Sequence, residues 1–356
     1  EEDFREVDVK GKAVLILTEA TRSNLNNLPE VIMAREKGAT MAFVCVSGSE
    51  DEFKTLATQT REYLYSERLS LTKPKLASGG PGVFAVSSVF IEHAFGTTYS
   101  RLKLLASESA RKGIKKMKPV TIRYRASAEI KTVKAENVLG YLEGTDKKDE
   151  LLVITAHYDH IGKYSSGEGD LINNGADDDG SGTVSVLQLA KAFARAKEDG
   201  AGPRRSILFM TVSGEEMGLL GSDYYTKNPV FPLSKTIVNL NIDMIGRRDP
   251  QHRNSEPYVY VIGSDKLSTE LHQINEQANK TYTNLTFDYT YNDQDHPERL
   301  YYRSDHWNFA KNNIPIIFYF DGIHEDYHMP SDEVDKIEFD LLARRAQCVF
   351  YTAWEI

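Results

Sequence analysis

The stretch from residue 151 to residue 160, LLVITAHYDH, changes abruptly from apolar to polar. Its first six residues form a short apolar run of the length expected for a buried strand. The run ends at His157 and Asp159, so an imidazole and a carboxylate are expected at the tip of that strand. Ligands bind beyond the carboxyl ends of strands in open α/β sheets. The stretch therefore predicts a buried strand and also the edge of the sheet at which chemistry takes place.

Strands and helices alternate along the chain around this stretch. Further apolar runs predict strands at residues 206–212, 236–242, 258–262 and 314–320, and helical patterns are found at residues 183–196, 266–280 and 338–355. Such alternation predicts a mostly parallel sheet with helices on both faces. We therefore expect an α/β fold with a mostly parallel mixed sheet flanked by helices for residues 119–356.

The first third of the chain has a smaller α/β pattern of its own. Strands are expected at residues 13–17, 41–46 and 83–86, with helices at residues 28–37 and 100–116. Gly38 ends the first of these helices. His93 is the only histidine there, and we interpret it as a packed or surface residue rather than a ligand. These differences place a domain boundary near residue 118, with a first domain at 1–118 and a second at 119–356.

The composition excludes several classes of function. The 356 residues are 40% apolar and 27% charged, which is typical of a soluble globular protein rather than a disordered one. A net charge of −9 repels phosphate backbones and argues against nucleic acid as a partner. The basic cluster at residues 111–118 is interpreted as a solvated face. No apolar run approaches the roughly 18 residues needed to span a membrane.

The two cysteines, Cys45 and Cys348, lie far apart in the sequence. They provide neither a disulfide framework nor a thiolate zinc site. Any metal must therefore be bound by histidine and carboxylate side chains.

Three adjacent carboxylates, Asp177, Asp178 and Asp179, stand immediately before the helix at residues 183–196. One aspartate would serve as a helix cap, where the helix dipole favours negative charge. Three neighbouring negative charges repel one another unless a cation lies between them, so we favour a metal site.

Other predicted strand tips carry similar residues. Glu215 and Glu216 follow the strand at 206–212, Asp243 follows 236–242 within an apolar run, and His328 comes after 314–320. A buried aspartate needs a partner or a metal. A set that mixes nitrogen and oxygen donors without cysteine suits catalytic zinc, with cobalt or manganese as substitutes.

These residues, in this order, resemble the M28 family of di-zinc peptidases, whose fold is that of zinc exopeptidases. The match consists of His157-x-Asp159, Asp178 followed by Asp179-Gly180-Ser181-Gly182, Glu215-Glu216, Asp243 and His328, and it spans residues 120–356. The resemblance implies two Zn²⁺ ions and peptide substrates.

The resemblance also implies a role for each residue. Asp178 would bridge both ions, with His157 and Asp243 completing one site and Glu216 and His328 the other. Glu215 would be the general base, and Asp159 would accept a hydrogen bond from the ligand imidazole. Relatives have a cis peptide after the bridging aspartate, so we expect one between Asp178 and Asp179.

The first domain resembles the protease-associated domain inserted in such peptidases, through Val9-x-Gly11-Lys12-Ala13-Val14 and Gly38-Ala39-Thr40. In relatives, helices of the catalytic domain usually precede that insertion, so this sequence is expected to be a fragment or a processed form. No signal-type segment is present, and the resemblance implies a secreted or periplasmic protein.

The sequence leaves the direction of cleavage open. Aminopeptidase activity, with metal-activated water and Glu215 as base, is the favoured interpretation, and Tyr301, Tyr302 or Arg303 would contact the substrate. A carboxypeptidase would need an arginine cluster, for which Arg303 and Arg247-Arg248 are the candidates. A one-zinc glutaminyl cyclase and an inactive receptor relative remain further alternatives. Ser304-Asp305-His306 is not expected to form a serine triad, because residues adjacent in sequence rarely converge in that way.

Overall fold

The computed structural model describes residues 8–18, 25–46, 49–65, 69–72, 82–106, 120–123 and 129–356. The chain forms two compact units, Glu1–Lys131 and Thr132–Ile356. The boundary predicted at residue 118 lies outside the described residues, as do the basic cluster at 111–118 and the end of the helix predicted at 100–116. None of the helices that the structure describes is both long and apolar enough to cross a bilayer.

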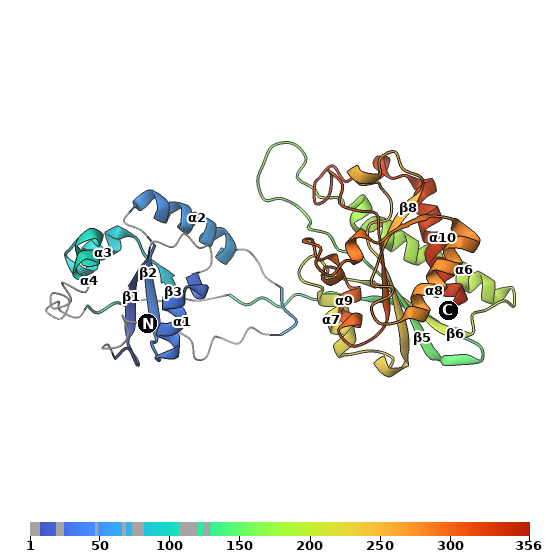
Figure 1. The fold of residues 1–356 in the computed structure, drawn as a ribbon, viewed down its shortest axis with the longest axis horizontal. Helices are drawn as coiled ribbons and strands as arrows, with labels where there is room; N and C mark the ends of the chain where they lie inside the picture. Colours follow the sequence, from blue (N-terminus) through green and yellow to red (C-terminus); the bar gives the residue numbers. More distant parts are fainter. Residues whose placement is uncertain are drawn as a thin grey trace. The chain divides into compact units, whose positions relative to one another are not determined.

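The first unit contains a small parallel sheet in the order β1-β2-β3 (Figure 1). Its strands are β1 (Ala13–Leu17), β2 (Met41–Cys45) and β3 (Gly82–Ala85). Its helices are α1 (Pro29–Glu36), α2 (Glu50–Tyr65), α3 (Ser88–Phe95) and α4 (Tyr99–Ala106). The central strand β2 is buried along its whole length, which accounts for its continuous apolar run. His93 is exposed on α3, as expected for a residue that is not a ligand.

The second unit is built on a seven-stranded mixed sheet in the order β4-β6-β5-β7-β10-β8-β9. The four central strands β6, β5, β7 and β10 are parallel to one another, whereas β4 runs antiparallel to β6 and β8 runs antiparallel to β10. The edge strand β9 is parallel to β8. The strands are β4 (Val138–Leu142), β5 (Lys147–His157), β6 (Arg205–Val212), β7 (Thr236–Ile242), β8 (Tyr258–Ile262), β9 (Thr286–Asp288) and β10 (Ile316–Phe320). The predicted mostly parallel α/β fold is thereby confirmed.

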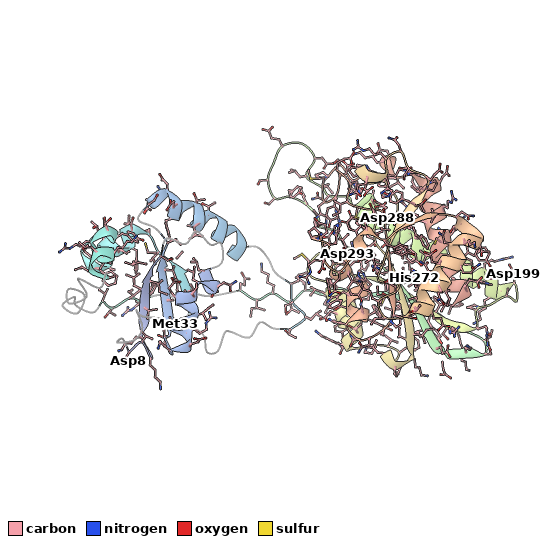
Figure 2. All side chains as sticks on the ribbon, viewed as in Figure 1. Asp8, Met33, Asp199, His272, Asp288 and Asp293 are labelled. Carbon is pink, nitrogen blue, oxygen red and sulfur yellow. The ribbon has the colours of Figure 1, made fainter. Side chains whose placement is uncertain are left out.

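Helices cover both faces of this sheet (Figure 1). Side chains of β5 alternate between two apolar clusters: Leu152 and Ile154 pack with α6, α8 and α10, whereas Leu151 and Val153 pack with α7 and α9. The helices are α6 (Gly182–Glu198), α7 (Leu220–Lys227), α8 (Thr269–Ala278), α9 (His306–Ala310) and α10 (Phe339–Glu355). Figure 2 shows the described side chains on this fold, with Met33 on α1 and His272 on α8. Burial of both faces explains the continuous apolar runs of the central strands.

The structure contains elements that the apolar pattern did not predict. The edge strand β4 is partly exposed and includes Gly140, and β9 is only three residues long, so neither forms an apolar run. The helices α2, α3, α7 and α9 were also missed. The two predicted strands at residues 236–242 and 258–262 coincide with β7 and β8 residue for residue.

Candidate metal centre

The predicted metal ligands converge at the carboxyl ends of the central strands. β5 ends at His157, Asp243 directly follows β7, and Glu216 lies in the loop after β6. His328 lies in the loop after β10, and Asp178 lies in the irregular turn η4 (Ala176–Ser181) that precedes α6. Because β6, β5, β7 and β10 are parallel, their carboxyl ends lie at one edge of the sheet. The topology therefore brings together residues as far apart in sequence as His157 and His328.

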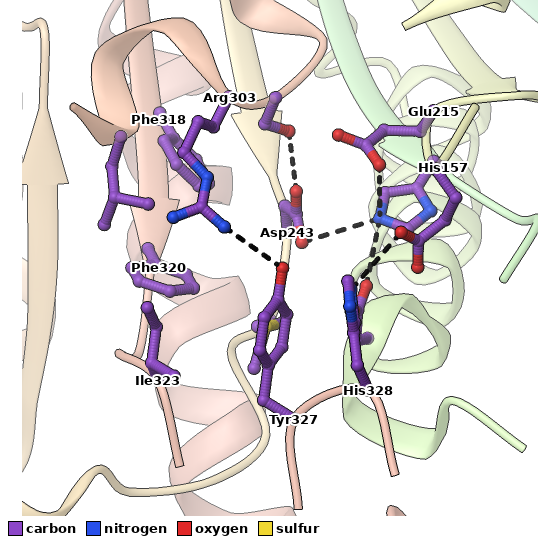
Figure 3. A pocket seen from close by; sticks show the side chains of 14 residues that line it. His157, Glu215, Asp243, Arg303, Phe318, Phe320, Ile323, Tyr327 and His328 are labelled. Atoms are coloured by element: carbon purple, nitrogen blue, oxygen red, sulfur yellow. Dashed lines mark hydrogen bonds and ion pairs between the residues drawn. The ribbon is translucent and has the colours of Figure 1, made fainter. Parts of the chain in front are cut away.

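The ligand atoms form two groups that share Asp178. Figure 3 shows His157, Asp243 and His328 of these groups. In the first group, His157 Nε2 lies 3.2 Å from Asp178 Oδ1 and 3.6 Å from Asp243 Oδ1. In the second group, His328 Nε2 lies 3.2 Å from Asp178 Oδ2 and 3.3 Å from Glu216 Oε2. The two oxygens of Asp178 thus face different groups, as a bridging carboxylate requires.

These separations fit zinc. Two ligands bound tetrahedrally at zinc–ligand distances of 2.0 to 2.2 Å lie roughly 3.3 to 3.6 Å apart. The four separations run from 3.2 to 3.6 Å. Asp178 Oδ2 and Glu216 Oε1 are also buried without a hydrogen-bond partner, and buried charges need a counterion or a metal. The residues present are therefore suited to hold two ions.

The three adjacent aspartates, which predicted a metal site, have separate partners in the structure. Only Asp178 faces the ligand groups. The carboxylate of Asp179 accepts hydrogen bonds from the main-chain amides of His157 (3.0 Å), Gly182 (3.0 Å) and Met244 (3.1 Å). The peptide between Asp178 and Asp179 is cis, as expected.

Asp177, the first of the three, turns away from the ligand groups. Its carboxylate accepts hydrogen bonds from the main-chain amide of Gly246 (2.7 Å) and from Nε2 of the buried His324 (3.1 Å). Asp177 thus ties the η4 turn to the loops after β7 and β10.

Asp159 does not make the contact that was expected of its side chain. The Nδ1–H of His157 donates to the main-chain carbonyl of Asp159 at 2.9 Å, whereas the Asp159 carboxylate lies 3.9 Å from that nitrogen. That carboxylate instead accepts the main-chain amide of Glu215 at 3.1 Å. The backbone after β5 thus directs the carbonyl rather than the side chain at the ring. Nδ1 of His157 is engaged by this contact, and Nε2 is left to face Asp178.

Asp243 is oriented by a hydrogen bond from Ser304, a contact that no sequence motif indicates. Ser304 donates to Asp243 Oδ2 at 2.6 Å and itself accepts from the Asn241 amide at 2.9 Å. The neighbours of Ser304 have other partners: Asp305 pairs with Ser222, and His306 Nε2 donates to the Tyr301 carbonyl at 2.8 Å. These three consecutive residues therefore do not form a serine triad, as expected.

Glu215 lies beside the first ligand group, with Oε2 4.0 Å from His157 Nε2 and a side chain only 10% exposed. Burial raises the pKa of Glu215 well above its usual value, and the nearby charges of Asp243 and Asp305 add to this effect. A carboxyl whose pKa is raised in this way is suited to take up a proton during a reaction and to release it again.

An apolar wall adjoins the ligand groups. Figure 3 shows Phe318, Phe320 and Ile323 across the pocket from His157, with Tyr327 and Arg303 between them. The Arg303 guanidinium lies 2.9 Å from Glu298 and 3.5 Å from the Tyr327 hydroxyl. The pocket is lined by His157, Asp178, Glu215, Glu216, Asp243, Met244, Leu300, Arg303, Ser304, Phe318, Phe320, Ile323, Tyr327 and His328.

The three residues expected to contact the substrate separate into two places. Arg303 lines the pocket of the ligand groups, but Tyr301 and Tyr302 line a second cavity together with Lys266 and Arg299. The tyrosine beside the ligand groups is Tyr327, adjacent in sequence to His328. With 19 tyrosines in the chain, residue type did not distinguish Tyr327 from the others.

A third imidazole, that of His160, was also missed. Its Nδ1 lies 2.7 Å from Glu216 Oε1 and 3.9 Å from Asp178 Oδ2, so His160, Asp178 and Glu216 form a further group of potential ligands. The only sequence signal was its place beside His157 and Asp159 at the tip of β5.

Comparison with known proteins assigns the family. A sequence profile of Peptidase family M28 matches residues 137–353, more than half of the chain, and the chain belongs to this family. Aminopeptidase YwaD of Bacillus subtilis is 26% identical over 229 residues, which cover 62% of this chain and 44% of that protein. A probable leucine aminopeptidase of Trichophyton verrucosum is 28% identical over 218 residues, covering 59% of this chain and 55% of the relative. The chain thus spans about half the length of these two curated relatives.

The fold itself is found in solved structures. The structure of an aminopeptidase from Aneurinibacillus sp. strain AM-1 superposes with a TM-score of 0.54 at 20% identity, covering 99% of this chain and 71% of that chain. This likeness supports the α/β architecture described above.

Proposed function

We propose that this chain is a di-zinc aminopeptidase that hydrolyses the N-terminal peptide bond of peptides. The observation that carries the proposal is the pair of ligand groups sharing Asp178, with His157 and Asp243 on one side and Glu216 and His328 on the other. The names of the two curated aminopeptidase relatives agree with it. His157, Asp178, Glu216, Asp243 and His328 would hold two zinc ions, whose chemistry would be activation of a water and polarisation of the scissile carbonyl.

Glu215 carries the proton transfers in this proposal. It takes a proton from the attacking water and returns it to the nitrogen of the leaving amine. The burial of Glu215 supports this role. Burial disfavours the charged carboxylate and so raises its pKa, which helps the side chain to hold the proton between the two transfers. The Tyr327 hydroxyl and the Arg303 guanidinium are positioned to contact the polar part of a substrate at the same pocket.

The pairing of the nearby arginines favours an amine over a carboxylate as the terminal group of the substrate. Arg303, the arginine that lines the pocket, lies 2.9 Å from Glu298. The two other arginines considered for a carboxypeptidase are paired: Arg247 lies 2.9 Å from Asp326, and Arg248 lies 3.0 Å from Glu338. We propose that the apolar wall formed by Phe318, Phe320 and Ile323 receives an apolar N-terminal side chain.

The proposal is tested on protein that is stripped of metal with a chelator and reloaded with Zn²⁺. We expect two bound ions per chain, release of nitroaniline from leucine p-nitroanilide, and no release from its N-acetylated form. Glu215→Gln is expected to keep both ions and to lose on the order of 10²–10⁴-fold in kcat. The matched control is Glu168→Gln, an exposed residue of the loop before η4.

Two results would refute parts of this assignment. A chain that binds no zinc refutes the peptidase mechanism as a whole. Two bound ions with release of C-terminal residues alone would instead assign the chain as a carboxypeptidase of the same fold.

A further inference from the structure

The half of the metal centre that contains Glu216 has two imidazoles near it rather than one. His328 approaches Glu216 Oε2 at 3.3 Å, and His160 approaches the other oxygen, Oε1, at 2.7 Å. His328 is 36% exposed, whereas His160 is 9% exposed. His160 is thus the more buried imidazole of this half. The distances from its Nδ1 atom to Glu216 and Asp178 indicate its function.

The separations distinguish a metal ligand from a residue that holds a ligand in place. Two atoms bound to one tetrahedral zinc lie roughly 3.3 to 3.6 Å apart. His328 meets this condition with both Asp178 (3.2 Å) and Glu216 (3.3 Å). His160 does not, because 2.7 Å to Glu216 is too short and 3.9 Å to Asp178 is too long. A separation of 2.7 Å is that of a charge-assisted N–H···O⁻ contact.

The atoms that meet at this contact are unpaired in the structure. Both ring nitrogens of His160 and Glu216 Oε1 are buried, and none of them has a hydrogen bond of ordinary geometry. Nδ1 and Oε1 nevertheless lie only 2.7 Å apart. Because a buried polar atom without a partner is destabilising, a small rotation of the ring that completes an Nδ1–H···Oε1 hydrogen bond would satisfy both side chains.

The ring of His160 is held in place by the same turn that carries Asp178. Gly175 precedes this turn with a φ of +64°, and a Cβ added there would lie 2.7 Å from the His160 ring and would also collide with the Asp178 carbonyl. The ring further meets that of His328 edge to face at 5.7 Å between centroids. His160 is consequently fixed relative to both Asp178 and His328.

We propose that His160 is a positioning residue: its Nδ1–H donates to Oε1 of Glu216 and so keeps Oε2 directed at the half-site shared with Asp178 and His328. The role rests on the di-zinc function proposed above. Partners that orient a ligating carboxylate typically contribute 10- to 100-fold to metal affinity. The contribution is confined to one half of the centre, because Glu216, the residue that His160 orients, belongs to that half alone.

The experiment compares three variants by zinc titration of the metal-free full chain against a competing chelator, which resolves two binding steps. His160→Phe keeps a ring but removes the donor, and we expect one step to weaken 10- to 100-fold while the other is unchanged. His160→Asn places an amide donor near the position of Nδ1, and we expect it to restore most of that loss. His93→Phe, at an exposed position on α3, is the matched control and should leave both steps unchanged.

Cobalt spectra separate positioning from ligation. Because His160 is not a ligand in this proposal, the visible absorption of His160→Phe fully loaded with Co²⁺ should keep the intensity of the parent protein. The proposal is overturned if both zinc affinities are unchanged in His160→Phe. It is also overturned if that variant binds only one ion or its cobalt spectrum changes coordination number, since His160 would then be a ligand. A parent protein that binds fewer than two ions refutes the di-zinc function itself, and this result is visible before any variant is made.

Discussion

Thr155, in the buried part of β5, donates a hydrogen bond of 2.6 Å to the side-chain oxygen of Asn241 on the neighbouring strand β7. The Asn241 amide donates to Ser304, and Ser304 donates to Asp243. All of these side chains are buried, so the chain of hydrogen bonds crosses the interior of the sheet and ends on a proposed metal ligand. Polar networks in low-dielectric surroundings hold their members firmly when every group is satisfied. The orientation of Asp243 is therefore set by the buried side chains of Thr155, Asn241 and Ser304.

Ser304→Ala should weaken zinc binding in the half of the centre that contains His157 and Asp243. The substitution removes the donor to Asp243 Oδ2, and loss of such a partner typically costs 10- to 100-fold in metal affinity. Zinc titration against a chelator measures the effect. Ser255→Ala, in an exposed turn, is the control and should bind as the parent protein does. Equal affinities in the two variants would contradict the prediction.

Gly175→Ala should destabilise the second unit more than Gly200→Ala. Both glycines have positive φ, +64° and +83°, so each substitution incurs the left-handed penalty of about 1 to 2 kcal/mol. At Gly200 the added methyl group meets nothing within 4 Å, whereas at Gly175 it meets the Asp178 carbonyl and the His160 ring. Overpacking adds about 1 to 3 kcal/mol at Gly175. Urea denaturation of the metal-free variants measures the difference, and equal midpoints would show that the η4 turn is not packed as described.

The stability of the metal-free protein should depend on pH through His306. Burial lowers the pKa of His306 to about 3, against the smaller opposing effect of its hydrogen bond to the Tyr301 carbonyl. The unfolded chain, with an ordinary histidine pKa near 6.5, binds one more proton between these values. The free energy of unfolding contributed by His306 is therefore complete above about pH 6.5 and is lost as the pH falls toward 3.

The check on His306 is a difference between two proteins. His306→Gln does not take up this proton on unfolding, so its free energy of unfolding should change less with pH than that of the parent protein. Between roughly pH 4 and 6, the two slopes should differ by about 1.4 kcal/mol per pH unit. Urea denaturation at a series of pH values gives both slopes. Parallel curves would mean that His306 is not buried in its neutral form.

Ile323→Glu should change which N-terminal side chain is preferred. Ile323 is partly buried and lines the apolar wall of the pocket. A carboxylate there would repel an apolar side chain and attract a basic one. It should therefore lower kcat/KM for leucine p-nitroanilide and raise it for the p-nitroanilides of arginine and lysine. Loss of one well-placed apolar contact is worth about 1 to 3 kcal/mol, or roughly 10- to 200-fold. Val184→Glu, exposed on α6, is the control. An unchanged ratio of the substrates would place the N-terminal side chain elsewhere.

Much of the site was predictable because it follows from a parallel sheet. Apolar runs identified β5, β6, β7 and β10, and in a parallel sheet the residues that follow such strands lie at one edge. His157, Glu216 and Asp243 could therefore be grouped before any distance was known. The family resemblance added Asp178 as the bridging residue, and the structure directs its two oxygens at different ligand groups.

The contacts within the site were not predictable, because they depend on backbone directions in turns. One of three adjacent aspartates faces the ligand groups, since the η4 turn directs Asp177 toward Gly246 and Asp179 toward three main-chain amides. The same applies to the carbonyl of Asp159, which takes the place expected of its carboxylate.

The sequence by itself determined the fold class, the edge of the sheet that carries the site and the residue types gathered there, because periodicity and strand order are written in local patterns. Tertiary structure alone decided that His160 faces Glu216, that Ser304 holds Asp243 and that Tyr327 rather than Tyr301 borders the pocket. Each of these contacts joins segments distant in the chain. The distances in these contacts depend on how the distant segments pack against one another, and no local sequence pattern encodes that packing.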